Sequence, residues 1–426
     1  MKIVLATHGS LGDLHPFMAL GLALKSLGAE VILASHPDYR QKVEAAGLTF
    51  HDYGASRETY TRDLRMAPEA IIHRLTRDHG FMIKRLIAPY LETSVDHLRP
   101  LITDADMVVG SSFAYGAHIA AQLEQKPFTV IALQPTVMMS AYDPPKVKKA
   151  PFIFNPTHDW QRHYNRLIIR AGEAFMASTQ SSIRRIYKKF GLEPHISLGG
   201  ILSDHQTLAL YDPLIGKVEP DFPPNTHICG FPFYDSEDGH APQLSPELTA
   251  FLSNGPAPLV FGLGSAVVTG GGAFYRNAIK VTRHLNTRAV LLVGEGSPLL
   301  REDHGPDILA IAYAPHSLLF PRCRAIIHHG GIGSTAQALR SGRPQLVVPV
   351  FADQFDNARR VVRLGAGRHL NYDQWTLPKA ITALTPVLDD PDITIHAQEA
   401  RLSLTRHDGA ATAAALILNP RNTDWP

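Results

Sequence analysis

The sequence has very little cysteine. Only Cys229 and Cys323 occur among 426 residues, and two cysteines cannot form the set of disulfides that holds small secreted domains together. This scarcity fits a reducing compartment. The 22 histidines are scattered along the chain and form no H-x-x-x-H or C-x-x-C set, so the sequence predicts no metal site.

Long apolar runs and an excess of one charge are absent too. No apolar stretch reaches the roughly 20 residues that cross a bilayer. The residues after Met1-Lys2 lack the apolar core of a signal peptide. The net charge is +2 with histidine neutral, so no bulk field favours nucleic acid. We therefore expect a cytoplasmic protein that binds no nucleic acid.

One basic cluster leaves peripheral contact with the inner face of a membrane as an option. It lies in a predicted helix and consists of Arg184, Arg185, Lys188 and Lys189. A basic helix face can bind anionic lipid, but such a run is more often a solvated face.

Strands and helices alternate along the chain. Its length predicts two or three domains, and a hydrophobic content of 45% is enough for sizeable cores. The order of strand, helix and strand argues for parallel sheets with helices on both faces. A stretch rich in proline, glycine and acidic residues at 231–246 is the best linker, and the strand pattern restarts after it at 259–263. Earlier strands are expected at 2–7, 31–34, 107–110 and 128–133, with a helix from Phe17 to Leu27.

The stretch from Ala325 to Gly367 is the most informative. A short apolar strand ends in His328-His329-Gly330-Gly331, and a helical pattern follows from Ile332. Glycines let a backbone approach a ligand closely, and a helix N-terminus attracts negative charge. These residues predict a site for a diphosphate, although a glycine turn alone is more often only a tight turn.

The pattern continues as H-x-G-x-x-S, then G-x-P, then D-Q-x-x-N. It is formed by His329, Gly331, Ser334, Gly342, Pro344, Asp353, Gln354 and Asn357. It resembles the donor-sugar motif of family-1 nucleotide-sugar glycosyltransferases. The resemblance implies that His329 and Ser334, with the backbone at Gly331 and Gly333, hold the donor diphosphate. It also implies that Asp353 and Gln354 hold sugar hydroxyls and that Asn357 belongs to the same site.

Two departures from the family pattern leave the nucleotide open between uridine and thymidine. Tyr313-Ala314-Pro315-His316 stands where the family has W-x-P-Q, which lines the nucleobase. Gln337 stands where many plant members use glutamate to bind the ribose hydroxyls. The resemblance further implies that Ser265, in the pair Gly264-Ser265, lies near the phosphates.

The loop 8–16, HGSLGDLHP, resembles the G-x-x-G-D/H-x-x-P turn that opens members of the same family. The resemblance implies that Asp13 is the catalytic base. An unperturbed aspartate has a pKa of about 3.9 and is a weak base unless burial raises that value. The alternatives are that Asp13 only caps the turn, that His15 is the base, or that His15 is an N-cap residue beside Pro16. His8 is a weaker rival at the end of the strand.

The acceptor region is the least regular. Residues 135–156 are rich in proline, methionine and aromatics, and a helix with an apolar stripe from Trp160 to Phe175 follows. The stripe alone favours a helix that faces the core. The functional interpretation is a hydrophobic acceptor pocket, lined in part by Met138, Met139, Phe152 and Phe154.

The resemblance implies an α/β protein of the GT-B class, with two Rossmann-like parallel-sheet domains that face each other across a cleft. We expect an acceptor domain at 1–235, a donor domain at 236–405, and a C-terminal helix at 406–426 that packs back on the first domain. Stretches 9–17, 134–145 and 353–365 are similar to the bacterial rhamnosyltransferases that build rhamnolipids. Sterol and macrolide glycosyltransferases share some of these features.

The predicted function is inverting transfer of a hexose to a hydroxyl of a lipid-like or polyketide-like acceptor. The donor would be a dTDP-sugar such as dTDP-rhamnose, or a UDP-sugar such as UDP-glucose, and no metal or cofactor would be needed. Two alternatives stay open. One is a sugar-nucleotide epimerase of the same fold, and the other is a non-catalytic module that binds nucleotide sugars. An NAD-dependent oxidoreductase is disfavoured because the G-x-G-x-x-G fingerprint is incomplete.

Overall fold

The computed structural model of this chain describes residues 1–78, 80–148, 152–193, 196–197, 199–202, 205–236, 241–264, 271–404 and 408–419. The described residues form two compact units. The first unit consists of the described part of Met1–Tyr234 and the C-terminal helix α17 (Gly409–Leu418). The second unit begins at Asp235 and continues through the described residues of Ala241–Arg406.

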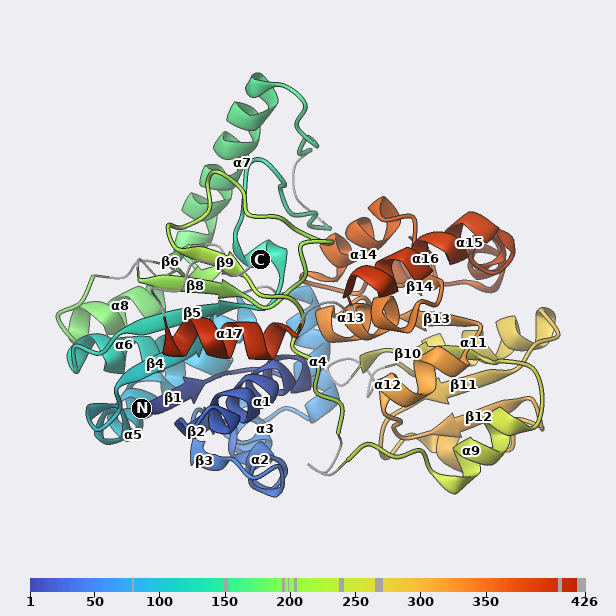
Figure 1. The fold of residues 1–426 in the computed structure, drawn as a ribbon, viewed down its shortest axis with the longest axis horizontal. Helices are drawn as coiled ribbons and strands as arrows, with labels where there is room; N and C mark the ends of the chain where they lie inside the picture. Colours follow the sequence, from blue (N-terminus) through green and yellow to red (C-terminus); the bar gives the residue numbers. More distant parts are fainter. Residues whose placement is uncertain are drawn as a thin grey trace. The chain divides into compact units, whose positions relative to one another are not determined.

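The first unit is built on a sheet of seven strands, all paired in parallel. In chain order they are β1 (Lys2–Ala6), β2 (Glu30–Ser35), β3 (Thr49–Asp52), β4 (Met107–Ser111), β5 (Phe128–Ala132), β8 (Gln206–Ala209) and β9 (Thr226–Ile228). In space their order is β3-β2-β1-β4-β5-β8-β9 (Figure 1). A separate antiparallel pair is formed by β6 (Ile196–Ser197) and β7 (Gly200–Ile201).

Helices connect these strands, as parallel pairing requires. They are α1 (Leu11–Ser26), α2 (Arg40–Ala45), α3 (Arg57–Leu64), α4 (Pro68–Arg77), α5 (Leu91–Thr103), α6 (Tyr115–Leu123), α7 (Asp159–Ala177) and α8 (Ser181–Lys189). Shorter helical turns span Pro37–Tyr39, Met82–Ile87, Ala88–Tyr90 and Pro135–Val137.

The alternation of side chains along each strand places a core on both faces of this sheet. Ile3 and Leu5 pack with α1 on one face, whereas Val4 packs on the other face with α5 and α6. Successive side chains of a strand point to opposite faces, and in β1 both sets are apolar. A strand buried on both faces is typical of parallel sheets.

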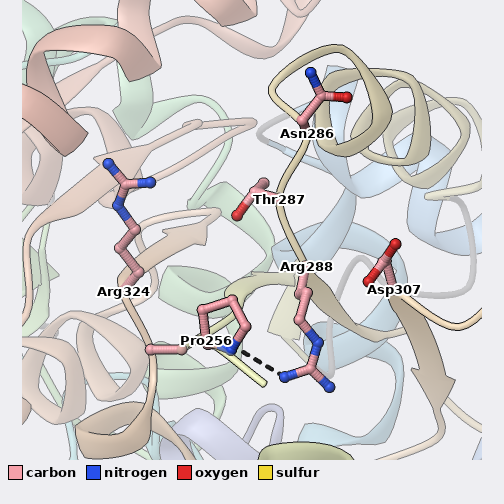
Figure 2. A pocket seen from close by; sticks show the side chains of 7 residues that line it. Pro256, Asn286, Thr287, Arg288, Asp307 and Arg324 are labelled. Atoms are coloured by element: carbon pink, nitrogen blue, oxygen red, sulfur yellow. Dashed lines mark hydrogen bonds between the residues drawn. The ribbon is translucent and has the colours of Figure 1, made fainter. Parts of the chain in front are cut away.

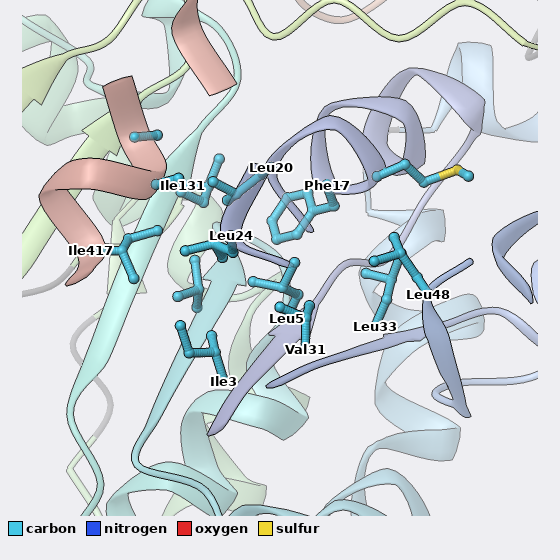
Figure 3. Packing of buried hydrophobic residues seen from close by; sticks show 14 of the residues in the cluster. Ile3, Leu5, Phe17, Leu20, Leu24, Val31, Leu33, Leu48, Ile131 and Ile417 are labelled. Carbon is cyan, nitrogen blue, oxygen red and sulfur yellow. The ribbon is translucent and has the colours of Figure 1, made fainter. Parts of the chain in front are cut away.

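The C-terminal helix α17 packs against α1 although the two are far apart in the sequence. Figure 3 shows Ile417 beside Leu20, Leu24 and Ile131 in one cluster of buried side chains. Burying each such side chain contributes about 1.5–3 kcal/mol. The end of the chain is therefore part of the core of the first unit.

The second unit repeats this architecture with six parallel strands. They are β10 (Leu259–Gly262), β11 (Ala289–Leu292), β12 (Ile308–Ile311), β13 (Ala325–His328), β14 (Gln345–Val347) and β15 (Gly367–His369), in the spatial order β12-β11-β10-β13-β14-β15. The helices are α9 (Pro246–Ser253), α11 (Gly272–His284), α12 (His316–Leu319), α13 (Ile332–Ser341), α14 (Gln354–Arg363), α15 (Leu377–Asp389) and α16 (Pro391–Leu404). Leu259 and Phe261 face one core and Val260 the other.

Two predicted boundaries are wrong. Helix α1 begins at Leu11, not at Phe17, because Ser10 caps it, so His15 lies inside the helix and is not its N-cap residue. The second is a strand that the apolar run after Pro344 predicts over residues 345–350, whereas β14 ends at Val347. The N–H groups of Val350 and Phe351 donate to the side chain of Gln354 instead of to a neighbouring strand.

Helix α7 differs more from the prediction that favoured a core-facing stripe. Of its 19 residues, only Asn165 is buried. Trp160, Leu167 and Phe175 of the apolar stripe are 59%, 64% and 79% exposed. Asn165 anchors the helix, since its amide donates to the carbonyls of Ala141 and Phe154. Of the stripe, Trp160 and Tyr164 contact Phe154, while Leu167 and Phe175 are left exposed.

No helix of the described residues is both long enough and apolar enough to cross a bilayer.

Candidate functional site

The turn between β1 and α1 places Asp13 at the carboxyl edge of the first sheet, where open parallel sheets bind ligands. Asp13 is the third residue of α1 and forms a capping box with Ser10. The N–H and Oγ of Ser10 donate to Asp13 Oδ2 at 2.8 and 3.2 Å. A Cβ atom at Gly9 would lie 2.2 Å from Oδ2, and Gly9 has a φ of +145°. Only glycine fits there.

Burial makes the Asp13 carboxylate a stronger base. Desolvation raises its pKa to about 6, against the opposing effect of its hydrogen bonds with Ser10. The side chain is still partly exposed. Both bonds from Ser10 use Oδ2, and no described residue donates to Oδ1. Asp13 therefore both caps the helix and keeps one carboxylate oxygen for a ligand.

The two other candidate bases, His8 and His15, have different surroundings. His8 lies beside His36. The Nδ1 of His36 lies 2.8 Å from the carbonyl of Ala55, and its Nε2 lies 3.1 Å from His8 Nδ1. A carbonyl only accepts, so neutral His36 must carry its proton on Nδ1 and accept from His8. Burial, and then His36, lower the pKa of His8 well below its ordinary value. The His15 ring packs at 5.2 Å from Tyr234.

In the second unit, the junction of β13 and α13 leaves a helix N-terminus open. Gly331 is the N-cap residue of α13, and no side chain in the described part of the chain caps the helix. The free N–H groups and the helix dipole favour an anion there, by about 0.3–1 kcal/mol for the dipole alone and up to about 2 when partly buried. Gly333 and the partly exposed Ser334 lie in this first turn.

The ring of His329 stands beside this N-terminus with almost no free space around it. A Cβ atom at Gly264 or Gly331 would lie 2.3 or 2.4 Å from ring atoms of His329. The residue is 7% exposed, and its Nδ1 has no hydrogen-bond partner among the described residues. Burial, followed by His328 and His316, lowers its pKa to about 3. A neutral, buried and unpartnered ring nitrogen is suited to a ligand oxygen.

His328 has a role in this turn that the sequence did not reveal. Its Nε2 lies 2.9 Å from Gln345 Oε1, and its Nδ1 accepts from the N–H of Gly330 at 3.1 Å. Both ring nitrogens are thus occupied, and the neutral form fits both bonds. Burial lowers its pKa to about 4. The H-H-G-G run draws attention to both histidines, but the sequence carries no signal that His328 is the one whose ring nitrogens are both bonded.

Helix α14 is tied to the same turn by Asn357. Its Nδ2 donates to the Gly330 carbonyl at 2.9 Å and to Asp353 Oδ2 at 2.7 Å. Gln354 is buried, and its Oε1 accepts the N–H groups of Val350 and Phe351 at 2.9 and 3.1 Å. Asn357 therefore orients Asp353, which is partly exposed, while Gln354 shapes the loop with its oxygen.

The predicted nucleobase residues follow β12. The hydroxyl of Tyr313 donates to Asp235 Oδ1 at 3.1 Å. The His316 ring stacks on Phe320 with centroids 4.3 Å apart. Burial lowers the pKa of His316, while the nearby Asp235 carboxylate raises it. The effect of His316 on the pKa of His329 shows that this loop and the β13–α13 turn are close enough to interact electrostatically.

Two further predicted positions have different outcomes. Ser265 lies outside the described residues. Gln337, at the position of the plant glutamate, is 7% exposed, and its Oε1 has no hydrogen-bond partner among the described residues. An unsatisfied buried oxygen on α13 could accept a ligand hydroxyl.

A pocket of about 270 Å³ elsewhere in the second unit is not this site (Figure 2). It lies where β10, β11 and β12 begin, the opposite edge from the one that binds ligands in such sheets. The guanidinium of Arg288 in the pocket donates to the carbonyls of Pro256 and Phe251. It also lies 4.0 Å from the Phe251 ring. The Arg288 guanidinium is therefore already engaged in contacts that stabilise the local structure.

The predicted acceptor residues form an aromatic group at the start of α7. Phe154 makes edge-to-face contacts with Phe152, Trp160 and Tyr164, with centroids 4.7–5.2 Å apart. Met138 is buried, whereas Phe152 is 68% exposed. An exposed aromatic surface of this kind commonly marks a binding region. Within the described residues, no group of three or more His, Cys, Asp or Glu side chains is arranged to hold a metal ion.

We predict that the chain loses stability as the pH falls from 7 to 5. His328 and His329 have folded pKa values of about 4 and about 3, so the unfolded chain binds more protons below about pH 6.5. Each should lower the free energy of unfolding by about 2 kcal/mol at pH 5. Asp13 acts in the opposite direction, because its raised pKa favours proton binding by the folded chain.

Urea unfolding at pH 7 and pH 5 measures this loss. The His328→Gln variant should show a smaller difference between the two pH values, since one of the two groups no longer titrates. If the free energy of unfolding falls by the same amount between pH 7 and pH 5 in the variant and in the parent chain, His328 does not contribute to the loss.

Comparisons with known proteins show which family and fold this chain resembles. Residues 3–131 match the model of the glycosyltransferase family 28 N-terminal domain, and residues 286–410 match that of the erythromycin biosynthesis protein CIII-like C-terminal domain. Vancomycin aglycone glucosyltransferase of Amycolatopsis orientalis is 29% identical, over 100% of this chain and 99% of the relative. Sterol 3-beta-glucosyltransferase of Arabidopsis thaliana is 25% identical, over 97% of this chain and 64% of the relative.

A solved structure extends the similarity to the fold. The structure of the glycosyltransferase of kitacinnamycin aligns with a TM-score of 0.69 at 20% identity, covering 98% of each chain. At this identity the alignment establishes the shared two-sheet fold and nothing about the ligand.

Proposed function

The chain belongs to the family-1/family-28 type of glycosyltransferases with the GT-B fold, and on that premise we propose that it moves a hexose from a nucleoside-diphosphate sugar to a hydroxyl of a hydrophobic acceptor. The observation that carries the proposal is the open N-terminus of α13 beside the unpartnered Nδ1 of His329. Together they offer hydrogen-bond donors to an anion without a competing protein group. A sugar diphosphate is the anion that this family uses.

The chemistry assigns one step to each unit. Asp13 Oδ1 accepts the proton of the acceptor hydroxyl, and the freed oxygen attacks the anomeric carbon. The bond from that carbon to the diphosphate breaks, and the sugar configuration inverts. The departing diphosphate gains negative charge, which the α13 N-terminus, His329 and Ser334 stabilise. Asp353, oriented by Asn357, holds hydroxyls of the sugar.

The acceptor class rests on this chain's aromatic surface and on its relatives. The names of the two relatives above specify the vancomycin aglycone and a sterol as acceptors. Both are bulky and carry hydroxyls. The exposed aromatic group around Phe154 offers a contact surface for such a molecule. We propose a lipid-like or polyketide-like alcohol as acceptor, with rhamnose or glucose as the sugar.

A donor panel tests the proposal. Thermal unfolding should be measured with UDP, dTDP and their glucose and rhamnose conjugates, with adenosine diphosphate as control. A ligand at 100 times its Kd stabilises the folded chain by about 2.7 kcal/mol, which is a rise of several degrees in Tm. We expect one of the two pyrimidine nucleotides to give that rise.

Incubation of the stabilising donor with a sterol or macrolide alcohol should then yield a glycoside. Release of the free sugar epimer without acceptor would instead identify an epimerase. Stabilisation with neither outcome would identify a binding module.

A further inference from the structure

One residue outside the family motif holds the predicted nucleobase loop in place. Asp235 is the first residue of the second unit, directly after Tyr234, the last residue of the first unit's main segment. One of its carboxylate oxygens, Oδ1, accepts from the Tyr313 hydroxyl at 3.1 Å, and the other, Oδ2, accepts from the N–H of Ser317 at 2.5 Å. A single carboxylate thus fixes both sides of the Ala314-Pro315 turn.

The bond to Ser317 replaces a cap that the sequence does not supply. Helix α12 has Pro315 as its N-cap residue, and no side chain of the described residues at that position caps it. Proline offers no side-chain oxygen to the N–H groups of the first turn. Asp235 supplies that oxygen from a segment 82 residues away in the chain. Hydrogen bonds to a charged acceptor are about twice as strong as neutral ones.

His316 lies between the two residues that Asp235 holds. Its ring stacks on Phe320 at an interplanar angle of 15°. The Asp235 carboxylate acts to raise the pKa of His316, and His316 in turn acts to lower the pKa of His329. We call Tyr313 and His316 the nucleobase platform, and the Asp235 carboxylate anchors this loop through the Tyr313 hydroxyl and the Ser317 N–H.

We propose that Asp235 is a positioning residue. It supports nucleotide binding indirectly, by orienting the nucleobase platform. This inference rests on the proposed donor site. The tyrosine that replaces the family's tryptophan then has a physical reason: its hydroxyl reaches the Asp235 carboxylate. The hydrogen bond removes the rotational freedom that an aromatic side chain on a loop would otherwise have.

Three variants and one control test the role of Asp235. Asp235→Ala removes both bonds, and Tyr313→Phe removes one while keeping the aromatic face. The double variant joins the two changes. Asp303→Asn is the control, because Asp303 Oδ1 accepts from the N–H of Gly305 at 2.9 Å in an exposed turn of the same unit. The measurements are the Kd of UDP and dTDP and the KM of donor and acceptor.

We expect Asp235→Ala to raise the nucleotide Kd and the donor KM about tenfold or more, because both charge-assisted bonds that hold the loop are lost. Tyr313→Phe should raise them about threefold to tenfold. The double variant should be no worse than Asp235→Ala alone, because the tyrosine bond is already lost. The acceptor KM and the control should stay within twofold of the parent chain. If Asp235 had only a structural role, its replacement by alanine would change kcat and the KM values of donor and acceptor together.

The failure of this inference can be told from failure of the proposed function. If the parent chain binds UDP or dTDP and the Asp235 and Tyr313 variants bind it within twofold as tightly, the role of Asp235 is overturned and the donor site stands. If the parent chain binds neither nucleotide, both are overturned. If Asp235→Ala does not fold, Tyr313→Phe decides, since it keeps the Ser317 cap.

Discussion

Replacing Asp13 by asparagine is expected to lower the rate of sugar transfer by about 100- to 10,000-fold, the usual contribution of a general base, while nucleotide binding stays unchanged. Asparagine keeps an oxygen that can accept the N–H of Ser10, so the cap of α1 is retained. It cannot take a proton from an alcohol. Single-turnover rates and nucleotide titrations of the purified variant measure the two effects.

The pH dependence of the parent enzyme provides an independent test of Asp13. A base must be deprotonated, so with a pKa of about 6 activity should rise as the pH increases through about 6 and then level off. His15→Gln is the matched control on the same helix and should retain most of the activity. Normal turnover in Asp13→Asn together with loss in His15→Gln would transfer the role of the base to His15.

Replacing His329 by alanine is expected to have the second large effect. It removes the ring that faces the α13 N-terminus, and loss of one donor to a developing oxyanion lowers kcat by about 100- to 1,000-fold. The affinity for the nucleoside diphosphate should fall as well, because we propose that the same ring also binds the diphosphate before it departs. Isothermal titration with UDP or dTDP and steady-state rates measure the two losses.

Two further variants separate ligand binding from packing at His329. His329→Gln keeps an N–H donor and should recover part of the affinity, which alanine cannot. His284→Ala, which removes an exposed histidine at the end of α11, should behave like the parent chain. Equal affinities in His329→Ala and the parent would show that the ring has only a structural role.

Much of the fold could be predicted from local patterns. Most strands of both sheets show as short apolar runs, because parallel strands buried on both faces are apolar throughout. The two-sheet GT-B class and the glycosyltransferase family are confirmed by the comparisons. The region between β2 and β4 was not predicted in detail. It contains the short β3 and several brief helices interrupted by turns, and such pieces are too short to show a clear period.

The site was predictable in its residue types and less so in its contacts. The motif identified His329, Asp353 and Asn357 as candidates, and these roles remain predictions. The contact of Asn357 with Gly330 and the double hydrogen bonding of His328 were not predictable. Each depends on a partner brought near by the sheet, and the chain between the partners carries no local signal of the contact.

By itself the sequence determined the class of chemistry, because hydrogen-bond donors, glycines and a helix start at a fixed spacing suit a diphosphate whatever surrounds them. Only the tertiary structure decided the pKa and the contacts of each of these groups. Burial sets the pKa of Asp13 and of His329. Gly264, far upstream in the chain, leaves room for the His329 ring, and Asp235 reaches Tyr313 across 78 residues. Such effects depend on which atoms exclude water and which donors meet, and only the folded chain determines those neighbours.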